Sequence, residues 1–245
     1  MAIQWKIFLE PTPDAGARYI DWLASGLAWT VGLALTAWVL ALALGFFVGV
    51  VRTLPQRWAV RWGDAYVELF RNIPLLVQLF LWYFVLPEVL PQAVGAWIKG
   101  VLPPWGPFFT SVICLALFTS ARIAEQVRAG IGALPRGQKS AALAVGMTMP
   151  QVYRHVLLPE ATRLIIPPLT SEFMTIFKNS SVALTIGLLE LTAQARQMNE
   201  FTFKTYEAFG AATVLYLMSA MTVNRVMAWI ERRSRIPGLI GQGGH

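Results

Sequence analysis

The sequence has few of the residues on which most catalytic and metal sites depend. Its 245 residues contain one cysteine, Cys114, and two histidines, His155 and His245. A single cysteine excludes an internal disulfide and a multi-cysteine metal site, and the histidines lack metal-binding spacing. The chain also has no Gly-x-x-x-x-Gly-Lys-Ser/Thr loop, the usual cradle for ATP phosphates. We therefore expect no catalytic residue, no metal site and no cofactor bound by this chain.

Charged residues are also scarce. Only 13% of the residues are charged and 56% are hydrophobic, whereas soluble domains carry about 25% charged residues. Long uncharged runs predict an all-α integral membrane protein in contact with the lipid bilayer. The formal net charge of +7 comes from basic residues clustered between the apolar runs. Membrane topology explains this pattern better than nucleic-acid binding, so we expect no nucleic-acid partner.

The apolar runs predict five transmembrane helices. They cover approximately residues 22–51, 66–86, 100–121, 160–186 and 208–230. The fourth is the least apolar, and its polar residues suit a helix buried among others or lining a path. Asn72-Ile73-Pro74 should kink the second helix. Gly26, Gly32, Gly45 and Gly49 in the first helix allow a neighbouring helix to approach closely, and Gly45 and Gly49 form a GxxxG pattern.

Three basic segments set the predicted topology. They are the loop 52–61 with Arg52, Arg57 and Arg61, the central segment with Arg136, Lys139 and Arg154, and the tail with Arg232, Arg233 and Arg235. The positive-inside rule places all three in the cytoplasm. Five spans then leave the N-terminus outside and the C-terminus inside. The predicted organisation is a periplasmic or interfacial arm (1–21), a transmembrane domain (22–230) and a basic cytoplasmic tail (231–245).

The central segment 134–159 is predicted to form two short helices joined at a turn. Gly146 is suited to a left-handed cap that ends the first helix. Thr148 and Gln151 form a capping-box pattern at the start of the second. Pro159 is expected to interrupt the helical pattern before the next apolar run. A compact helix pair between two spans is typical of a docking surface rather than a catalytic pocket.

This segment resembles the cytoplasmic "EAA" loop of permease subunits in bacterial ABC importers. The matching residues are Ser140, Ala141, Ala142 and Gly146, followed by Val156-Leu157-Leu158-Pro159. The resemblance implies that Ser140, Ala141, Ala142, Gly146, Leu158 and Pro159 belong to a loop that docks on a cytoplasmic ATPase. Ser140 stands where the family usually has glutamate, so one polar contact with the ATPase is expected to differ.

Longer stretches resemble the polar amino-acid permeases of this class, and most of all those of glutamate/aspartate importers. They are YVELFRNIPLLVQLFLWYFVLP, ARIAEQVRAGIGALPRGQKSAALAVGMT, RHVLLPEA and PPLTSE. The resemblance implies an ATP-driven complex in the bacterial inner membrane. Its other parts would be a second, related permease, an ATPase dimer that binds ATP-Mg, and a periplasmic substrate-binding protein. An importer of glutamine or of basic amino acids is the nearest alternative.

An acidic substrate needs cationic partners inside the membrane. Arg122 and Lys178 are the deepest cations in the predicted spans, and Asn179 and Ser180 are adjacent to Lys178. These four residues are our predicted substrate path. The alternative is an internal ion-pair network, in which Arg122 pairs with Glu125 and Lys178 with Glu172. The sequence leaves both interpretations open.

Two other classes of protein are less compatible with the sequence. A secondary transporter or channel acting alone would leave the central segment without a partner, and five spans without an internal repeat are unusual for that class. An intramembrane enzyme needs convergent acid, base or metal-binding residues, and the two histidines are poorly placed for such a site.

Overall fold

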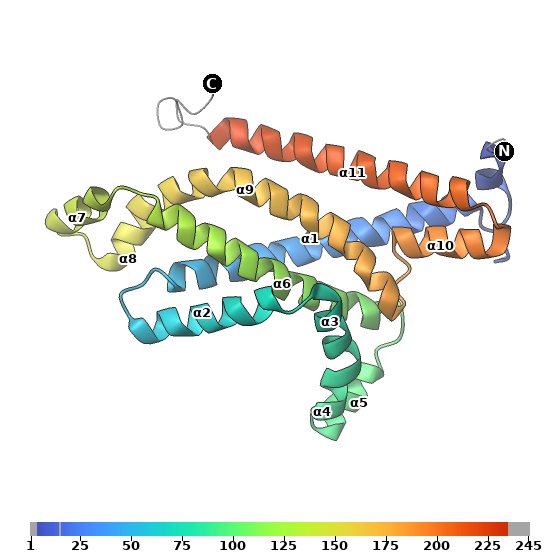
Figure 1. The fold of residues 1–245 in the computed structure, drawn as a ribbon, viewed down its shortest axis with the longest axis horizontal. Coiled ribbons are helices and arrows are strands. Elements are labelled where there is room, and N and C mark those ends of the chain that lie inside the picture. The colour runs from blue at the N-terminus through green and yellow to red at the C-terminus, as the bar shows by residue number, and fades with distance from the viewer. Residues whose placement is uncertain (1–3, 15, 235–245) are drawn as a thin grey trace.

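The computed structural model describes residues 4–14 and 16–234, and these form an elongated helical bundle (Figure 1). The long helices are α1 (Tyr19–Val51), α2 (Arg57–Asn72), α6 (Trp105–Gly132), α9 (Leu158–Asn179) and α11 (Thr205–Ser234). The short helices are α3 (Leu75–Phe80), α4 (Leu86–Val89), α5 (Gln92–Lys99), α7 (Arg136–Ala144), α8 (Met149–Val152) and α10 (Leu191–Thr202). Two 3-10 segments, η1 (Trp5–Leu9) and η4 (Ser180–Ile186), and two π turns, η2 (Leu81–Val85) and η3 (Tyr153–Leu157), complete the order. Arg235 and the remaining tail lie outside the described residues.

Helices α1 and α6 pack closely against each other. A Cβ atom added to Gly45 would lie 2.6 Å from Cβ of Ile123, and one added to Gly49 would lie 2.5 Å from Cβ of Val127. Glycine at both positions therefore lets the two helices approach more closely than any larger residue would allow. The expected close approach is confirmed for Gly45 and Gly49, and for Gly26, whose added Cβ would lie 2.8 Å from Cγ of Gln194 on α10. It is wrong for Gly32, where an added Cβ would meet nothing within 4 Å.

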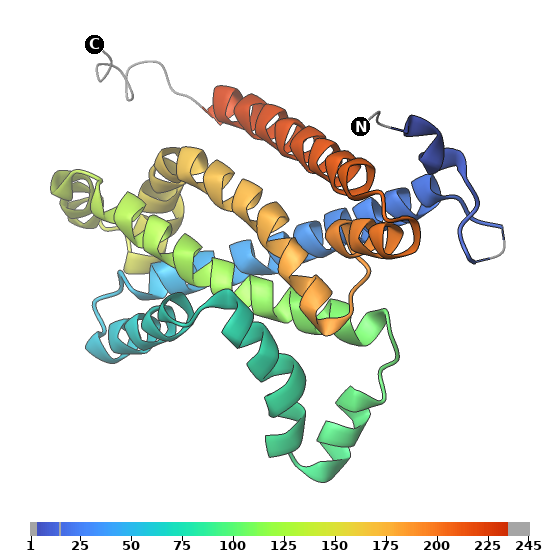
Figure 2. The same cartoon turned by 45° about the vertical axis from the view of Figure 1, so that its right-hand side comes forward.

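The main core joins α1, α6 and α9 and extends to both ends of α9. Trp38 of α1 stacks on Phe173 of α9, with ring centroids 4.6 Å apart. Ile123 and Val127 of α6 and Ile176 of α9 are fully or almost fully buried in the same cluster. Figure 2 shows α9 crossing over α1 and α6, while α11 lies further out. The three helices thus form the rigid centre on which the other elements are placed.

The second predicted span is broken. The helical axis turns by 100° between α2 and the segment 75–89, at the expected Asn72-Ile73-Pro74 position. The Gln78 side chain braces this elbow, because its Nε2 donates hydrogen bonds to the carbonyls of Phe70 (2.8 Å) and Ile73 (2.9 Å). These carbonyls lie at the end of α2, where helical partners are missing. A side-chain amide therefore supplies the hydrogen bonds that the bend removes.

Pro159 does not interrupt the helical path, contrary to the prediction. The chain continues from α8 through η3 into α9, and the Leu158 N–H donates to the Tyr153 carbonyl in a π turn. A proline ring crowds the carbonyl four residues earlier, and a wider π turn relieves this crowding. The same arrangement occurs in η2, where the Leu86 N–H donates to Leu81 and Pro87 follows.

A buried carboxylate fastens the opposite end of the bundle. Glu190 caps α10 by accepting hydrogen bonds from the N–H groups of Thr192 (3.0 Å) and Ala193 (2.9 Å). Its Oε2 also accepts from the hydroxyls of Tyr216 (2.7 Å) and Thr30 (3.4 Å). Burial raises the pKa of the Glu190 carboxyl, although these hydrogen bonds partly offset the rise. One side chain thus connects α1, α10 and α11.

The structure supports an all-helical membrane fold and leaves the count of five spans as a prediction. In the part of the chain described, α1, α6 and α11 are each long and apolar enough to cross a bilayer. The bent pair α2 and 75–89 would be a fourth if it forms one span. The remaining expected span corresponds to α9 and η4, whose helix carries Glu160, Arg163, Glu172 and Lys178.

The α1–α6 contact gives a direct test. Gly45→Ala should lower the free energy of unfolding by roughly 1–3 kcal/mol, because the new methyl group overpacks the contact with Ile123. Gly32→Ala is the matched control on the same helix, since a Cβ there meets nothing within 4 Å. Thermal unfolding in detergent should show a lower midpoint for Gly45→Ala alone. Equal midpoints for the two variants would contradict the tight contact.

Candidate functional site

The first part of the site is the helix pair formed by α7 and α8. The Gly146 φ of +87° is left-handed, as expected for a cap. The Gly146 N–H donates to Leu143 (3.0 Å) and the Met147 N–H to Ala142 (3.1 Å). These two hydrogen bonds form a Schellman motif, which satisfies carbonyls at the end of α7. The predicted cap of the first helix is confirmed.

The second helix begins as the capping pattern indicates. Gln151 Oε1 accepts a hydrogen bond from the Thr148 N–H at 2.8 Å, and Pro150 lies in the first turn of α8. Val152 is fully buried and Leu157 nearly so. The segment is therefore anchored by one apolar face.

The family-matched residues divide between an inner and an outer face of the pair. Ala142 is buried in the main core, while Ser140, Ala141 and Gly146 are exposed. Leu158 is partly buried and Pro159 is exposed. Two further apolar side chains, Leu143 and Val145, are also exposed at the end of the bundle. The arrangement leaves an outer surface with small and apolar residues available for contact.

Tyr153 connects this pair to the turn between α1 and α2, a link that the sequence analysis missed. Its hydroxyl donates to the Thr53 carbonyl at 2.7 Å and lies 3.1 Å from Thr53 Oγ1. Tyr153 is four residues from Met149 and from Leu157, a spacing that places it on the same helical face. The spacing therefore indicates that Tyr153 is buried, but it does not identify Thr53 as its hydrogen-bond partner.

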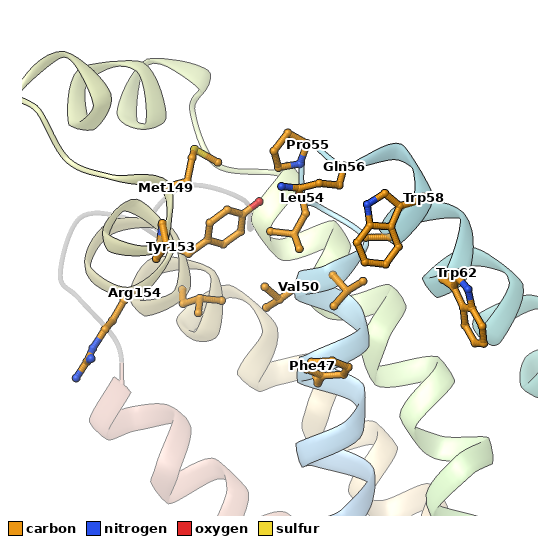
Figure 3. Close-up of a pocket in the computed structure, with 14 residues that line it drawn as sticks. Phe47, Val50, Leu54, Pro55, Gln56, Trp58, Trp62, Met149, Tyr153 and Arg154 are labelled. Carbon is orange, nitrogen blue, oxygen red and sulfur yellow. The ribbon is translucent and has the colours of Figure 1, made fainter.

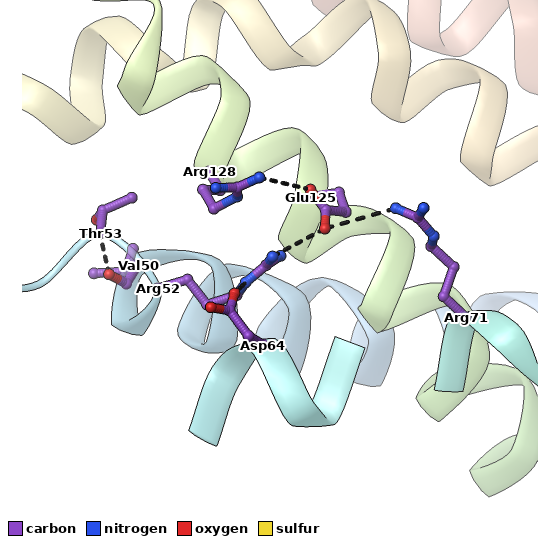
Figure 4. A network of polar contacts seen from close by, with 7 residues as sticks. All are labelled: Val50, Arg52, Thr53, Asp64, Arg71, Glu125 and Arg128. Atoms are coloured by element: carbon purple, nitrogen blue, oxygen red, sulfur yellow. Dashed lines mark hydrogen bonds and ion pairs between the residues drawn. The ribbon is translucent and has the colours of Figure 1, made fainter. Parts of the chain in front are cut away.

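The second part of the site is a charged network centred on Glu125 (Figure 4). The Glu125 carboxylate lies 2.9 Å from the guanidinium of Arg52 and 3.6 Å from those of Arg71 and Arg128. Arg52 is buried and also pairs with Asp64 at 2.7 Å. Glu125 therefore pairs with cations from α2, α6 and the end of α1. The alternative in which it pairs with Arg122 is wrong.

Arg122 instead pairs with Glu172 across the α6–α9 contact. Arg122 Nε donates to Glu172 Oε2 at 2.7 Å and Nη2 donates to Oε1 at 3.0 Å. Gln126 Nε2 donates to the same Oε1 at 3.0 Å. The Glu172 side chain is only 7% exposed, whereas that of Arg122 is 41% exposed. This two-point pair fixes one edge of a guanidinium whose other N–H groups remain accessible.

The other predicted path residues lie where α9 becomes η4. Lys178 is exposed, and its side chain has no partner among the described residues, 4–14 and 16–234. Glu172 pairs with Arg122 instead, so the alternative in which Lys178 pairs with Glu172 is also wrong. Asn179 is partly buried. The Ser180 side chain is buried and its hydroxyl donates to the Phe177 carbonyl at 2.6 Å. The structure thus brings Arg122 together with Glu172 and leaves Lys178 apart from them.

Comparison with known proteins identifies the family. Residues 41–236 match the family model described as a binding-protein-dependent transport system inner membrane component. The chain belongs to this family. The matched range includes the α7–α8 pair and the helices α6, α9 and α11.

Relatives in the family include amino-acid permeases. The chain is 48% identical to the glutamate/aspartate import permease GltJ of Escherichia coli K12, over 97% of both chains. It is 34% identical to the probable glutamine ABC transporter permease GlnM of Bacillus subtilis, over 81% of this chain and 88% of that protein. The likeness is therefore to permease subunits along nearly the whole length.

Solved structures show the same fold. The structure of an amino acid ABC transporter with histidines matches 88% of this chain and 95% of its own, with 31% identity and a TM-score of 0.73. An inward-facing structure of the MetNI methionine ABC transporter matches 89% of this chain and 98% of its own, with 21% identity and a TM-score of 0.72. The helical arrangement is therefore that of ABC importer permeases.

The left-handed cap of α7 generates a prediction about the helix pair. Gly146→Ala should destabilise the turn by about 1–2 kcal/mol, because a Cβ is unfavourable in the left-handed region. No atom lies within 4 Å of the added Cβ, so the cost is conformational. Hydrogen exchange of residues 134–159 should therefore become faster.

Gly137→Ala is the control within the same helix pair. Its added Cβ also meets nothing within 4 Å, and alanine favours the helical conformation by roughly 0.5–1 kcal/mol over glycine. Exchange should slow or stay unchanged in this variant. Slower exchange in Gly146→Ala would show that the cap does not hold the pair.

Proposed function

We propose that this chain is a permease subunit of an ATP-driven importer of glutamate and aspartate. The observation that carries this proposal is the 48% identity to GltJ over 97% of the chain. The half-exposed Arg122 adds a chemical reason, because an acidic side chain needs a cation in a low-dielectric path. The chain itself performs no chemistry, and partner ATPase subunits bind and hydrolyse ATP-Mg.

The proposed complex lies in the bacterial inner membrane. This chain pairs with a second, related permease, and a periplasmic binding protein delivers the substrate. We assign five spans to α1, the bent α2–α4 segment, α6, α9 with η4, and α11. The N-terminus is then outside and the α7–α8 pair is in the cytoplasm. The turn after α1 lies at the same end of the bundle as α7 and α8 (Figure 1), which agrees with the charge distribution.

Movement of the α7–α8 pair is the proposed link to ATP hydrolysis. The pair is continuous with α9 through η3 and is separated from the end of α6 by a short connection. Ala142, Val152 and Leu157 share the main core with both helices. Closure of the ATPase dimer therefore moves the ends of α6 and α9 together. The Tyr153–Thr53 hydrogen bonds carry the movement to α1 and α2.

Arg122 is the proposed selecting residue of the path. Glu172 holds its guanidinium from one edge, and Gln126 donates to the same carboxylate, so the direction of the guanidinium is fixed before substrate arrives. The remaining N–H groups are free to bind the side-chain carboxylate of the substrate. Lys178 and Asn179 belong to the same path at the end of α9. The Ser180 hydroxyl donates to the Phe177 carbonyl and is therefore not free to bind substrate. Ser180 contributes to the path only through its position at the break between α9 and η4.

The substrate is tested by ATP-dependent uptake of labelled glutamate into proteoliposomes that contain the whole complex. Aspartate should compete, while glutamine and arginine should not. Competition by glutamine or arginine would contradict specificity for acidic amino acids, but it would leave the proposal of an ATP-driven importer standing. Uptake by this chain without ATPase subunits would overturn the mechanism.

Replacing Arg122 tests the proposed path. Arg122→Ala should lower glutamate uptake about tenfold or more, because a charge-assisted hydrogen bond contributes roughly 1.5–3 kcal/mol. Arg122→Lys should recover part of the uptake, since it keeps the charge but loses the two-point geometry. Initial rates at several glutamate concentrations measure both effects.

Arg196→Ala provides the control for loss of one arginine. Arg196 is exposed and pairs within α10 with Glu200 at 2.9 Å, so uptake should stay unchanged. Thermal unfolding separates transport from folding. If Arg122→Ala unfolded at the normal temperature and kept normal uptake and preference, the assignment would be wrong.

A further inference from the structure

An apolar groove separates the α1–α2 turn from the α7–α8 pair. Its volume is about 820 Å³, and its walls come from the end of α1, the start of α2, and α8 with η3 (Figure 3). The lining residues include Phe47, Leu54, Trp58, Trp62, Met149 and Tyr153. The Tyr153–Thr53 hydrogen bonds connect the two walls. The groove is thus part of the connection between the helix pair and the spans.

Three large aromatic side chains remain open to the surroundings at this groove. Phe47 is 67% exposed, Trp58 is 71% exposed and Trp62 is 75% exposed. Trp58 and Trp62 are one turn apart on α2, so they form a stripe beside the groove. Tryptophan favours the level of lipid headgroups, where an apolar ring meets water. The last turn of the apolar helix α1 ends at the same place, which sets the groove at the edge of the hydrocarbon layer.

The charge around the groove has one sign. Arg154 belongs to the η3 wall, but its side chain is directed away from the other labelled groove residues (Figure 3). Arg57 and Arg61 are one turn apart on α2, next to the stripe formed by Trp58 and Trp62, and do not line the groove themselves. All three are exposed, and none forms an ion pair within the described segments. No acidic residue is among those that line the groove. The nearby carboxylate of Asp64 is already paired with Arg52.

We propose that this groove binds an anionic phospholipid of the adjacent leaflet. One acyl chain lies along Phe47, Leu54 and Met149. The headgroup phosphate is held by Arg57 and Arg61 on the α2 side of the groove. A basic cluster beside apolar surface is the combination that retains acidic lipids at a membrane surface. The assignment to the cytoplasmic leaflet rests on the proposed orientation, while lipid binding itself does not depend on substrate.

A bound lipid would brace the link on which coupling depends. It would touch both walls, so it would stabilise the arrangement in which Tyr153 reaches Thr53. ATP hydrolysis and transport by the complex should therefore stay coupled more tightly in bilayers that contain anionic lipid. This regulation adds to the proposed transport function and is independent of which amino acid is carried.

The test measures lipid binding to the intact complex by native mass spectrometry. Dioleoylphosphatidylglycerol is the anionic probe and dioleoylphosphatidylcholine the zwitterionic one. The phosphatidylglycerol should bind more tightly. Arg57→Gln and Arg61→Gln should each weaken its binding about fivefold, since one arginine near an acidic lipid contributes roughly 1 kcal/mol. Trp58→Ala should weaken the binding of both lipids.

Trp97→Ala is the matched control, because Trp97 is 73% exposed on α5 and does not line the groove. It should leave lipid binding unchanged. Equal binding of the two lipids, or unchanged phosphatidylglycerol binding in all three groove variants, would overturn the proposal. Loss of ATPase subunits from the Trp58→Ala complex, with lipid binding intact, would show that a protein surface occupies the groove instead.

Discussion

The close approach of α1 and α6 is the constraint on which the remaining structure depends. Gly45 and Gly49 remove the side chains that would separate the helices, and Ile123 and Val127 fill the space. This contact fixes the rotation of α6. The fixed rotation places Glu125 toward α2 and Arg122 toward α9, so two polar clusters form on different sides of one helix. A wider spacing between α1 and α6 would separate Arg52, at the end of α1, from Glu125 on α6.

Two carboxylates inside the bundle, Glu172 and Glu125, are stabilised because each meets several partners. Glu172 accepts three hydrogen bonds from α6, and Glu125 lies near three arginines. An ion without such partners would be costly in an apolar interior. A cation at the surface of the bundle can be paired on one edge and accessible on the other. Arg122 is such a cation, because Glu172 fixes its geometry and its other N–H groups are accessible.

Local features were predictable from the sequence, whereas contacts between distant helices were not. The Gly146 cap, the Thr148–Gln151 pattern and the bend at Pro74 depend on a few neighbouring residues, and all three were predicted. The partners of Arg122 and Glu125 depend on helix rotation and distance, and the i,i+3 spacing on α6 suggested the wrong pair. The sequence predicts an interruption at Pro159, because proline lacks the N–H of a regular helical turn. The structure accommodates it with a π turn, which the sequence pattern does not reveal. The family resemblance predicted which residues dock on the ATPase, but it did not reveal the contact of Tyr153 with Thr53.

The Glu190 cluster ties α1 to α10 and α11 at Thr30, in the first half of the helix. The segment from Thr30 to Val51 is about 33 Å long at 1.5 Å per residue. Along that segment Gly45 and Gly49 hold α1 against α6. α1 is therefore fastened to different helices at two levels. A force applied at the Thr53 turn would reach α10 and α11 only if α1 and α6 moved together as one body.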